Sequence, residues 1–150
     1  MTKFTMLSVS KSRPAPVVVD GRQINFDNEI KTLGLSLRRT GIVKHLGDRA
    51  RIARNQTSKI KRFVNLSTQT KRHLYKALIQ PVIEYPIIPV ATASDTQLLK
   101  LQRIQNKNIK FMVANDTELC NKTLQECHEK LELDPVNRRS MHAWRSYGIK

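Results

Sequence analysis

The spacing of hydrophobic residues changes near residue 40, from a pattern typical of strands to one typical of helices. Before that point, short apolar stretches are separated by polar residues, proline and glycine. They predict strands over 3–9, 17–19, 22–26 and 30–37. Asp20-Gly21 separates the second stretch from the third, and this dipeptide favours the positive φ angles of a tight hairpin turn. Gly34 lies inside the last stretch, where we expect a bulge or a close backbone approach.

From residue 41 onward, apolar residues recur at every third or fourth position, which is the period of an amphipathic helix. The first stripe predicts a long helix and consists of Val43, Leu46, Ala50, Ala53, Thr57, Ile60 and Val64. A second helix is predicted from Ser67 or Thr68, with a kink or break at Pro81 because proline lacks the backbone N–H. Its apolar face is expected to hold Leu74, Ala77, Leu78, Val82 and Tyr85.

A third helix is predicted to begin at Ser94 or Asp95, both of which are common N-caps, and to end near Val113. Its buried side is expected to hold Leu98, Leu101, Ile104 and Phe111. Asn108 lies towards the same side. Burial of its amide would cost about 1–4 kcal/mol unless a hydrogen bond compensates.

Two start signals predict helices near the C-terminus. Thr123 and Glu126 have the spacing of a capping box, which predicts a short helix ending at Leu131. Asp134-Pro135 has the pattern of an N-cap followed by proline in the first helical position, and predicts a last helix. The predicted fold class is therefore α+β. A small antiparallel β-hairpin unit (1–39) precedes a helical bundle (40–114) and a helical connector (115–150).

Composition narrows the class of protein. The chain has 150 residues, 39% of them hydrophobic, which is enough for a modest core. Aromatic residues make up 5%, which argues against a platform that stacks single-stranded bases. No apolar run is long enough to span a bilayer, and residues 1–8 do not have the pattern of a secretion signal. Two cysteines cannot form a disulfide framework, so we expect an intracellular location. Because no apolar run could span a bilayer, we also expect no membrane partner.

Positive charge is concentrated in the middle of the chain. The sequence has 27 Lys and Arg against 12 Asp and Glu, a net charge of +15. Twelve of the bases and only one acid, Asp48, lie between residues 38 and 76, so this stretch carries +11. A solvated helix face is the alternative, and a membrane surface is disfavoured because the middle of the apolar stripe consists of small residues, Ala50, Ala53 and Thr57. We expect a polyanion to bind here, through Lys44, Arg49, Arg51, Arg54, Lys59, Lys61, Arg62, Lys71 and Arg72.

Candidate catalytic and metal-binding patterns are weak. The aspartates are scattered, and none form a pair that would hold two metal ions. Cys120, Cys127 and His128 do not have the spacing of a zinc site. We expect Cys127 to be a small core residue and His128 to be exposed.

Residues 74–85 (LYKALIQPVIEY) and 98–107 (LLKLQRIQNK), together with 30–37 (IKTLGLSL), resemble reverse transcriptases of non-LTR retrotransposons of the jockey-like kind. The resemblance extends from about residue 2 to residue 133. It implies that residues 2–8 are the end of the palm and that the helices of 41–113 are the thumb. It also implies a primer-grip hairpin at Leu33, Gly34 and Leu35. It adds Arg103 and Lys107 to the candidate phosphate contacts, the alternative being that these two side chains are simply solvated.

The resemblance implies a nuclear protein that binds an RNA–DNA or DNA duplex through backbone contacts. The family's fingers and its Mg²⁺-binding aspartates lie upstream of the matching residues, so we expect no cofactor and no catalysis by this chain in isolation. The family's usual residues are replaced at Met1, Thr32, Arg38, Pro86, Val90, Ala91 and Asn108. These departures are typical of a truncated, drifting copy, and equally of a fragment kept for another use. The alternatives are an interaction module that binds the missing palm or self-associates, and a basic RNA-binding protein of ribosomal type.

Overall fold

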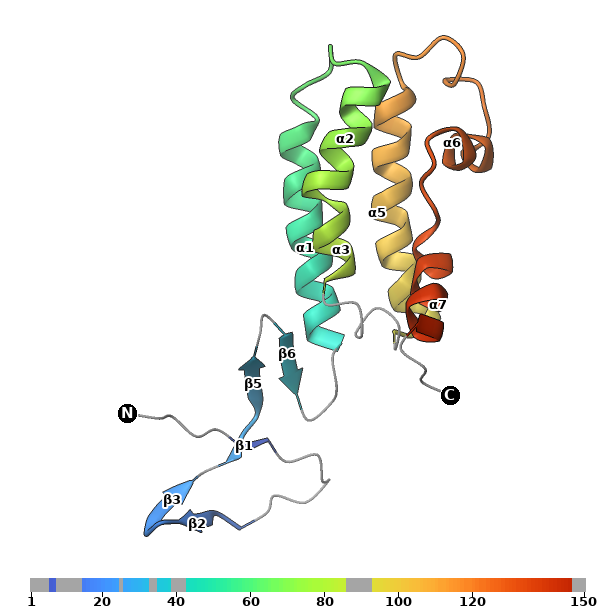
Figure 1. Cartoon of the computed structure of the whole chain (residues 1–150). Coiled ribbons are helices and arrows are strands. Elements are labelled where there is room, and N and C mark those ends of the chain that lie inside the picture. Colours follow the sequence, from blue (N-terminus) through green and yellow to red (C-terminus); the bar gives the residue numbers. More distant parts are fainter. Residues whose placement is uncertain are drawn as a thin grey trace. The chain divides into compact units, whose positions relative to one another are not determined.

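A computed structural model of the chain describes residues 6–7, 15–24, 26–32, 35–38, 43–85 and 93–146 (Figure 1). The fold class is α+β, as predicted, with short strands followed by helices. The chain forms two compact units, Met1–His45 and Leu46–Lys150.

The predicted hairpin at Asp20-Gly21 is confirmed in the N-terminal unit. Strands β2 (Val17–Val19) and β3 (Arg22–Ile24) pair in antiparallel register, and both turn residues have positive φ, 49° at Asp20 and 72° at Gly21. The following strand is shorter than predicted. β3 ends at Ile24, and β4 (Phe26–Asp27) pairs in parallel with β1 (Met6–Leu7), which is the described part of the strand predicted over 3–9.

The prediction of one strand over residues 30–37 was wrong. Two strands lie there, β5 (Glu29–Thr32) and β6 (Leu35–Arg38), and they pair with each other in antiparallel register, with Ile30 opposite Leu37. A long strand and a short hairpin produce the same alternation of side chains, so hydropathy does not distinguish them. Leu33 and Gly34, between the two strands, lie outside the described residues.

The C-terminal unit is helical. Its helices are α1 (Val43–Ile60), whose first three residues belong to the N-terminal unit, α2 (Thr68–Leu78), α3 (Gln80–Glu84), α5 (Asp95–Val113), α6 (Leu124–Lys130) and α7 (Val136–Ser146). Figure 1 shows α1, α2 and α5 running alongside one another, and α5 also contacts α6 and α7. Three predicted starts are confirmed: Ser67 caps α2, and Ser94 and Thr123 form capping boxes at α5 and α6.

The apolar stripe of α1 is buried as predicted from Leu46 to Ile60, with Ala53 fully buried. Val64, which was predicted to continue the stripe, lies beyond the end of the helix and is 49% exposed. On α5, Leu101 and Ile104 are buried as predicted, so these two helices supply much of the core.

The predicted buried face of the second helix was wrong. Leu78 and Tyr85 are about half exposed, whereas the buried side chains of α2 and α3 are Lys71, Arg72, Tyr75, Ile79 and Ile83. The buried row begins with two cations, and hydropathy excludes cations from a core even though their aliphatic stems pack well. The hydropathy pattern therefore predicted the wrong face of this helix to be buried.

Asn108 is buried, as predicted, and its amide is satisfied. Its Nδ2 donates to Thr57 Oγ1 at 3.0 Å and to the Ile104 carbonyl at 2.8 Å. Thr57 Oγ1 in turn donates to the Ala53 carbonyl at 2.8 Å. This chain of hydrogen bonds connects α5 to α1 inside the core, and it compensates the desolvation of the amide.

Replacing Asn108 by alanine is expected to lower the free energy of unfolding by about 1–3 kcal/mol, because the bond to Thr57 is lost and a cavity is left. Thr57→Val should cost about 1 kcal/mol for the same bond. The double variant should lose less than the sum of the two, since both substitutions remove one shared interaction. Urea unfolding measures all three. Strictly additive losses would contradict the assigned bond.

Candidate nucleic-acid interface

A groove of about 420 Å³ lies between α1 and α5 and is lined mainly by cations. Its lining residues are Arg54, Thr57, Ser58, Lys61, Lys100, Arg103, Ile104 and Lys107. Five of these eight are Lys or Arg, and none is Asp or Glu.

Helical periodicity explains how the two helices build the groove. Lys100, Arg103 and Lys107 follow one another at spacings of three and four along α5, so they share one face. Arg54 and Lys61 have a compatible spacing of seven at the C-terminal end of α1. Thr57 and Ile104 are buried between the two rows, whereas the long basic side chains extend outward.

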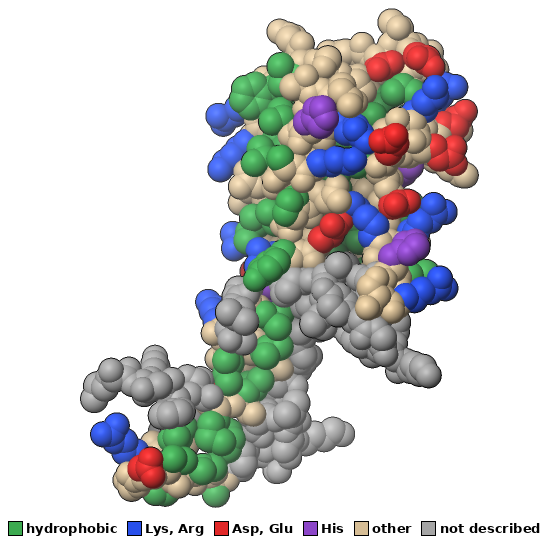
Figure 2. Space-filling view, in the orientation of Figure 1, with side chains coloured by type: hydrophobic (Ala, Val, Ile, Leu, Met, Phe, Trp, Pro, Cys, Tyr) green, Lys and Arg blue, Asp and Glu red, His purple; other side chains and the backbone are tan. Residues whose placement is uncertain are grey.

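The groove is strongly electropositive. Four of the cations are exposed and Lys61 is half-buried. In the described part of the chain, none of the five forms an ion pair with a carboxylate. In the face drawn in Figure 2, the Asp and Glu side chains of the bundle gather towards α5 and α6, away from the edge formed by α1. Unneutralised cations focused in a groove attract an anion with several charges.

The structure brings together four of the predicted phosphate contacts, namely Arg54, Lys61, Arg103 and Lys107. Lys100 was missed, although its spacing from Arg103 and Lys107 could have identified it. The other predicted cations of α1 and the loop after it do not line the groove. Arg51 lies 3.9 Å from Asp48, Arg49 lies over the Tyr85 ring, and Lys59 and Arg62 are exposed.

Lys71 and Arg72 must be removed from the predicted binding set because both are buried. Lys71 is 1% exposed, with its Nζ 5.0 Å from the centre of the Phe111 ring. Arg72 is 9% exposed and donates from its guanidinium to the Leu131 carbonyl and to the Glu132 carboxylate. These two cations hold α2 against neighbouring segments and cannot reach a phosphate.

Lys44 has a partner in the N-terminal unit. Its Nζ lies 2.6 Å from Glu29 Oε2, and Arg38 Nη2 lies 2.8 Å from the same oxygen. The hydrogen bond from Lys44, and then that from Arg38, lower the pKa of Glu29 to about 2. Lys44 is therefore neutralised locally.

This arrangement predicts an acid sensitivity of the β5–β6 hairpin. A carboxylate whose pKa is lowered on folding stabilises the fold above the pKa of the unfolded chain and loses that effect as pH falls towards the folded value. The hairpin should therefore loosen between about pH 4.5 and about pH 2, which is the pKa of folded Glu29. NMR titration of the Glu29 carboxyl carbon measures its pKa, and the amide signals of β5 and β6 report the loosening, which the control Glu29→Gln should not show over this pH range. A midpoint near the ordinary value for glutamate would contradict the predicted contacts.

The predicted primer-grip residues are described only in part. Leu33 and Gly34 lie outside the described residues, and Leu35 is the first residue of β6, opposite Thr32. The β5–β6 hairpin thus spans the position at which the resemblance implies a hairpin.

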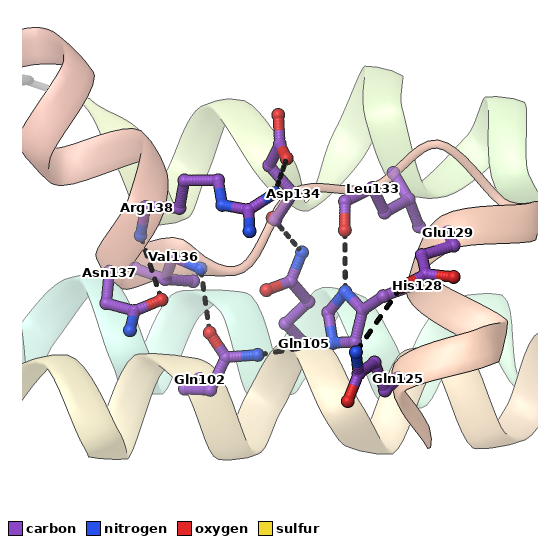
Figure 3. Close-up of polar contacts among 10 residues, drawn as sticks. All are labelled: Gln102, Gln105, Gln125, His128, Glu129, Leu133, Asp134, Val136, Asn137 and Arg138. Atoms are coloured by element: carbon purple, nitrogen blue, oxygen red, sulfur yellow. Dashed lines mark hydrogen bonds and ion pairs between the residues drawn. The ribbon is translucent and has the colours of Figure 1, made fainter. Parts of the chain in front are cut away.

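A second pocket, of about 600 Å³, lies between α5, α6 and α7. Figure 3 shows its polar contacts: His128 Nδ1 donates to the Leu133 carbonyl at 2.6 Å, and the Val136 N–H donates to Gln102 Oε1 at 2.7 Å. Gln105 Nε2 donates to the Asp134 carbonyl at 3.0 Å. These bonds attach the segment between α6 and α7 to the helices beside it.

The prediction that His128 is exposed was wrong, because it is 9% exposed and its ring takes part in this attachment. The chain reversal after α6 brings the Leu133 carbonyl to the ring, and hydropathy gives no sign of that contact. Cys127 is buried at 3% exposure, as predicted, and desolvation raises the pKa of its thiol.

Among the described residues, no helix is long and apolar enough to cross a membrane, and no group of three His, Cys, Asp or Glu residues is placed to hold a metal ion. Comparison of the chain with protein families, with curated proteins and with solved structures finds no match.

Proposed function

We propose that the groove between α1 and α5 binds the phosphate backbone of nucleic acid without sequence preference. The observation that supports this most is the set of five cations that line one groove and have no acidic partner in the described part of the chain. Backbone phosphates offer anionic oxygens at regular intervals, and Lys and Arg are the side chains that bind them most often.

The chemistry of the lining favours backbone contacts over base recognition. Among the described residues that line it are long flexible cations and a hydroxyl at Ser58, and none of them is an amide or an aromatic side chain that could read a base edge. Its affinity should therefore come mainly from the release of counterions from the nucleic acid, a term that does not depend on sequence.

We further propose that the chain corresponds to the end of the palm and the thumb of a non-LTR reverse transcriptase, as its sequence resemblance implies. In that role the groove would grip an RNA–DNA or DNA duplex, and the β5–β6 hairpin would lie at the primer end. Polymerase activity is not proposed for the chain by itself, because its sequence lacks the paired aspartates that hold Mg²⁺ in that family.

Salt dependence tests the binding proposal. Anisotropy of a labelled duplex should give a plot of log affinity against log salt with a slope of about −4 to −5, if each of the five cations neutralises one phosphate of B-form DNA. Two duplexes of unrelated sequence should bind within about threefold of each other, since the term is not sequence-dependent. Affinity that does not change with salt would contradict the proposal.

One observation favours a second candidate function, which is association with a polymerase palm or with another copy of the chain. The side chains of β2 are exposed and apolar, with Val18 66% exposed. Exposed apolar strands are common sites of strand pairing between chains. Sedimentation equilibrium of the wild type and of Val18→Lys tests this candidate. A monomer at all concentrations would exclude self-association.

A further inference from the structure

The turn after α1 exposes two apolar side chains beside the basic groove. Phe63 is 55% exposed and Val64 is 49% exposed. Lys61, two residues before Phe63, lines the groove at the C-terminal end of α1, and Arg62 between them is exposed. Figure 2 shows hydrophobic side chains at the surface next to Lys and Arg side chains at this end of the bundle.

The backbone of this turn is held in place. The Arg62 N–H donates to the Lys59 carbonyl at 3.2 Å, and the Phe63 N–H donates to the Ile60 carbonyl at 2.9 Å. Asn115, just beyond α5, donates from its Nδ2 to the Val64 carbonyl at 3.1 Å. Hydrogen bonds therefore connect the turn to α1 and to the residues after α5. Because the backbone is already ordered, a ligand that binds the Phe63 ring loses little conformational entropy in this turn.

The surroundings of Phe63 restrict what can cover its ring. Phe111 and Tyr85 in the same unit each have a cation over the ring, Lys71 and Arg49 respectively. No such contact to the Phe63 ring occurs within the described residues. Lys61 and Arg62 directly precede Phe63 in the chain, so a ligand with a flat apolar surface and negative charge matches the residue types of this turn. A nucleotide has both, since its base has a π face and its phosphate an anionic oxygen.

We propose that Phe63 stacks on an unpaired nucleobase of a strand whose phosphates lie in the α1–α5 groove. This inference rests on the proposed function and narrows its substrate class. Bases inside a continuous duplex are already stacked on both faces, so the ring gains a partner only where a base is unpaired. The preferred ligand is therefore a duplex that continues into a single strand, and a blunt duplex is bound less tightly.

The experiment compares two labelled ligands, a blunt duplex and the same duplex with a short single-stranded overhang, by anisotropy at one salt concentration. Wild-type protein should prefer the overhang by about 5- to 100-fold, the range expected for stacking of one base on an aromatic ring. Phe63→Leu, which keeps an apolar side chain but removes the flat ring, should abolish this preference. Phe63→Trp should retain it, and quenching of Trp fluorescence by the overhang beyond that of the wild type, whose one tryptophan is Trp144, would report the stacking.

Val64→Ala is the matched control, because it truncates the neighbouring exposed apolar residue and should leave the preference unchanged. Since Phe63 is exposed, its variants should unfold at the wild-type urea concentration. A wild type without preference, or a Phe63→Leu variant that keeps it, would overturn the stacking proposal while leaving backbone binding in place. Wild-type protein that binds neither ligand would overturn both.

Discussion

Replacing Arg54, Lys61, Arg103 and Lys107 together by glutamine is expected to lower duplex affinity by about 10²–10³-fold at about 150 mM salt. Each of these cations lines the α1–α5 groove, and each phosphate contact is worth about 1 kcal/mol at this salt concentration from counterion release. The four side chains extend outward from the helices, so the helical circular dichroism signal should not change. Anisotropy of a labelled duplex measures the effect.

The matched control makes the same change in net charge elsewhere in the unit. Lys122, Lys130, Arg138 and Arg145 are exposed on or next to α6 and α7 and do not line the groove. Glutamine at these four positions should lower affinity by less than about threefold, because distant charges are screened by salt. Equal losses in the two variants would show that net charge, and not the groove, determines binding.

Arg72→Ala is expected to lower the free energy of unfolding by about 2–4 kcal/mol. The substitution removes a charged donor from the Leu131 carbonyl and breaks the ion pair with Glu132. It also removes the aliphatic stem of a side chain that is 9% exposed. Both effects weaken the attachment of α2 to the segment that follows α6. Urea unfolding followed by circular dichroism measures the change.

Arg62→Ala provides the control for Arg72, because Arg62 is an exposed arginine in the loop just before α2. It should change the free energy of unfolding by less than about 0.5 kcal/mol. If Arg72→Ala is equally mild but weakens duplex binding, Arg72 contacts phosphate and its assignment to the core is wrong.

The parts of the fold that the sequence predicted well are those in which local signals agree. The starts of α5 and α6 have capping boxes, and the stripe of α1 places small apolar residues where the helix is buried. The buried face of α2 was misplaced because its core position is occupied by Lys71, whose burial depends on the Phe111 ring of another helix. Hydropathy predicted one strand in place of the β5–β6 hairpin, which the family resemblance alone implied, because a strand and a hairpin share one alternation of side chains.

The candidate site, too, could be predicted from local sequence signals but not where it depends on tertiary contacts. The concentration of positive charge on α1 can be read from the sequence, and it identified Arg54 and Lys61. That α5 is the helix facing them depends on tertiary packing, including the buried bond between Asn108 and Thr57. The spacing of Lys100 places it on one helix face with Arg103 and Lys107, but the spacing does not show that this face meets α1 and forms the groove.

The central claim is that nucleic acid binds in the groove between α1 and α5, and NMR mapping of the bound surface tests it most directly. Addition of a short duplex to isotope-labelled protein should shift the signals of Arg54, Lys61, Lys100, Arg103 and Lys107. Signals of α6 and α7 should stay in place, as should those of the buried Lys71. Shifts confined to α6 and α7, or no shift on addition of an excess of duplex at low salt, would contradict the claim.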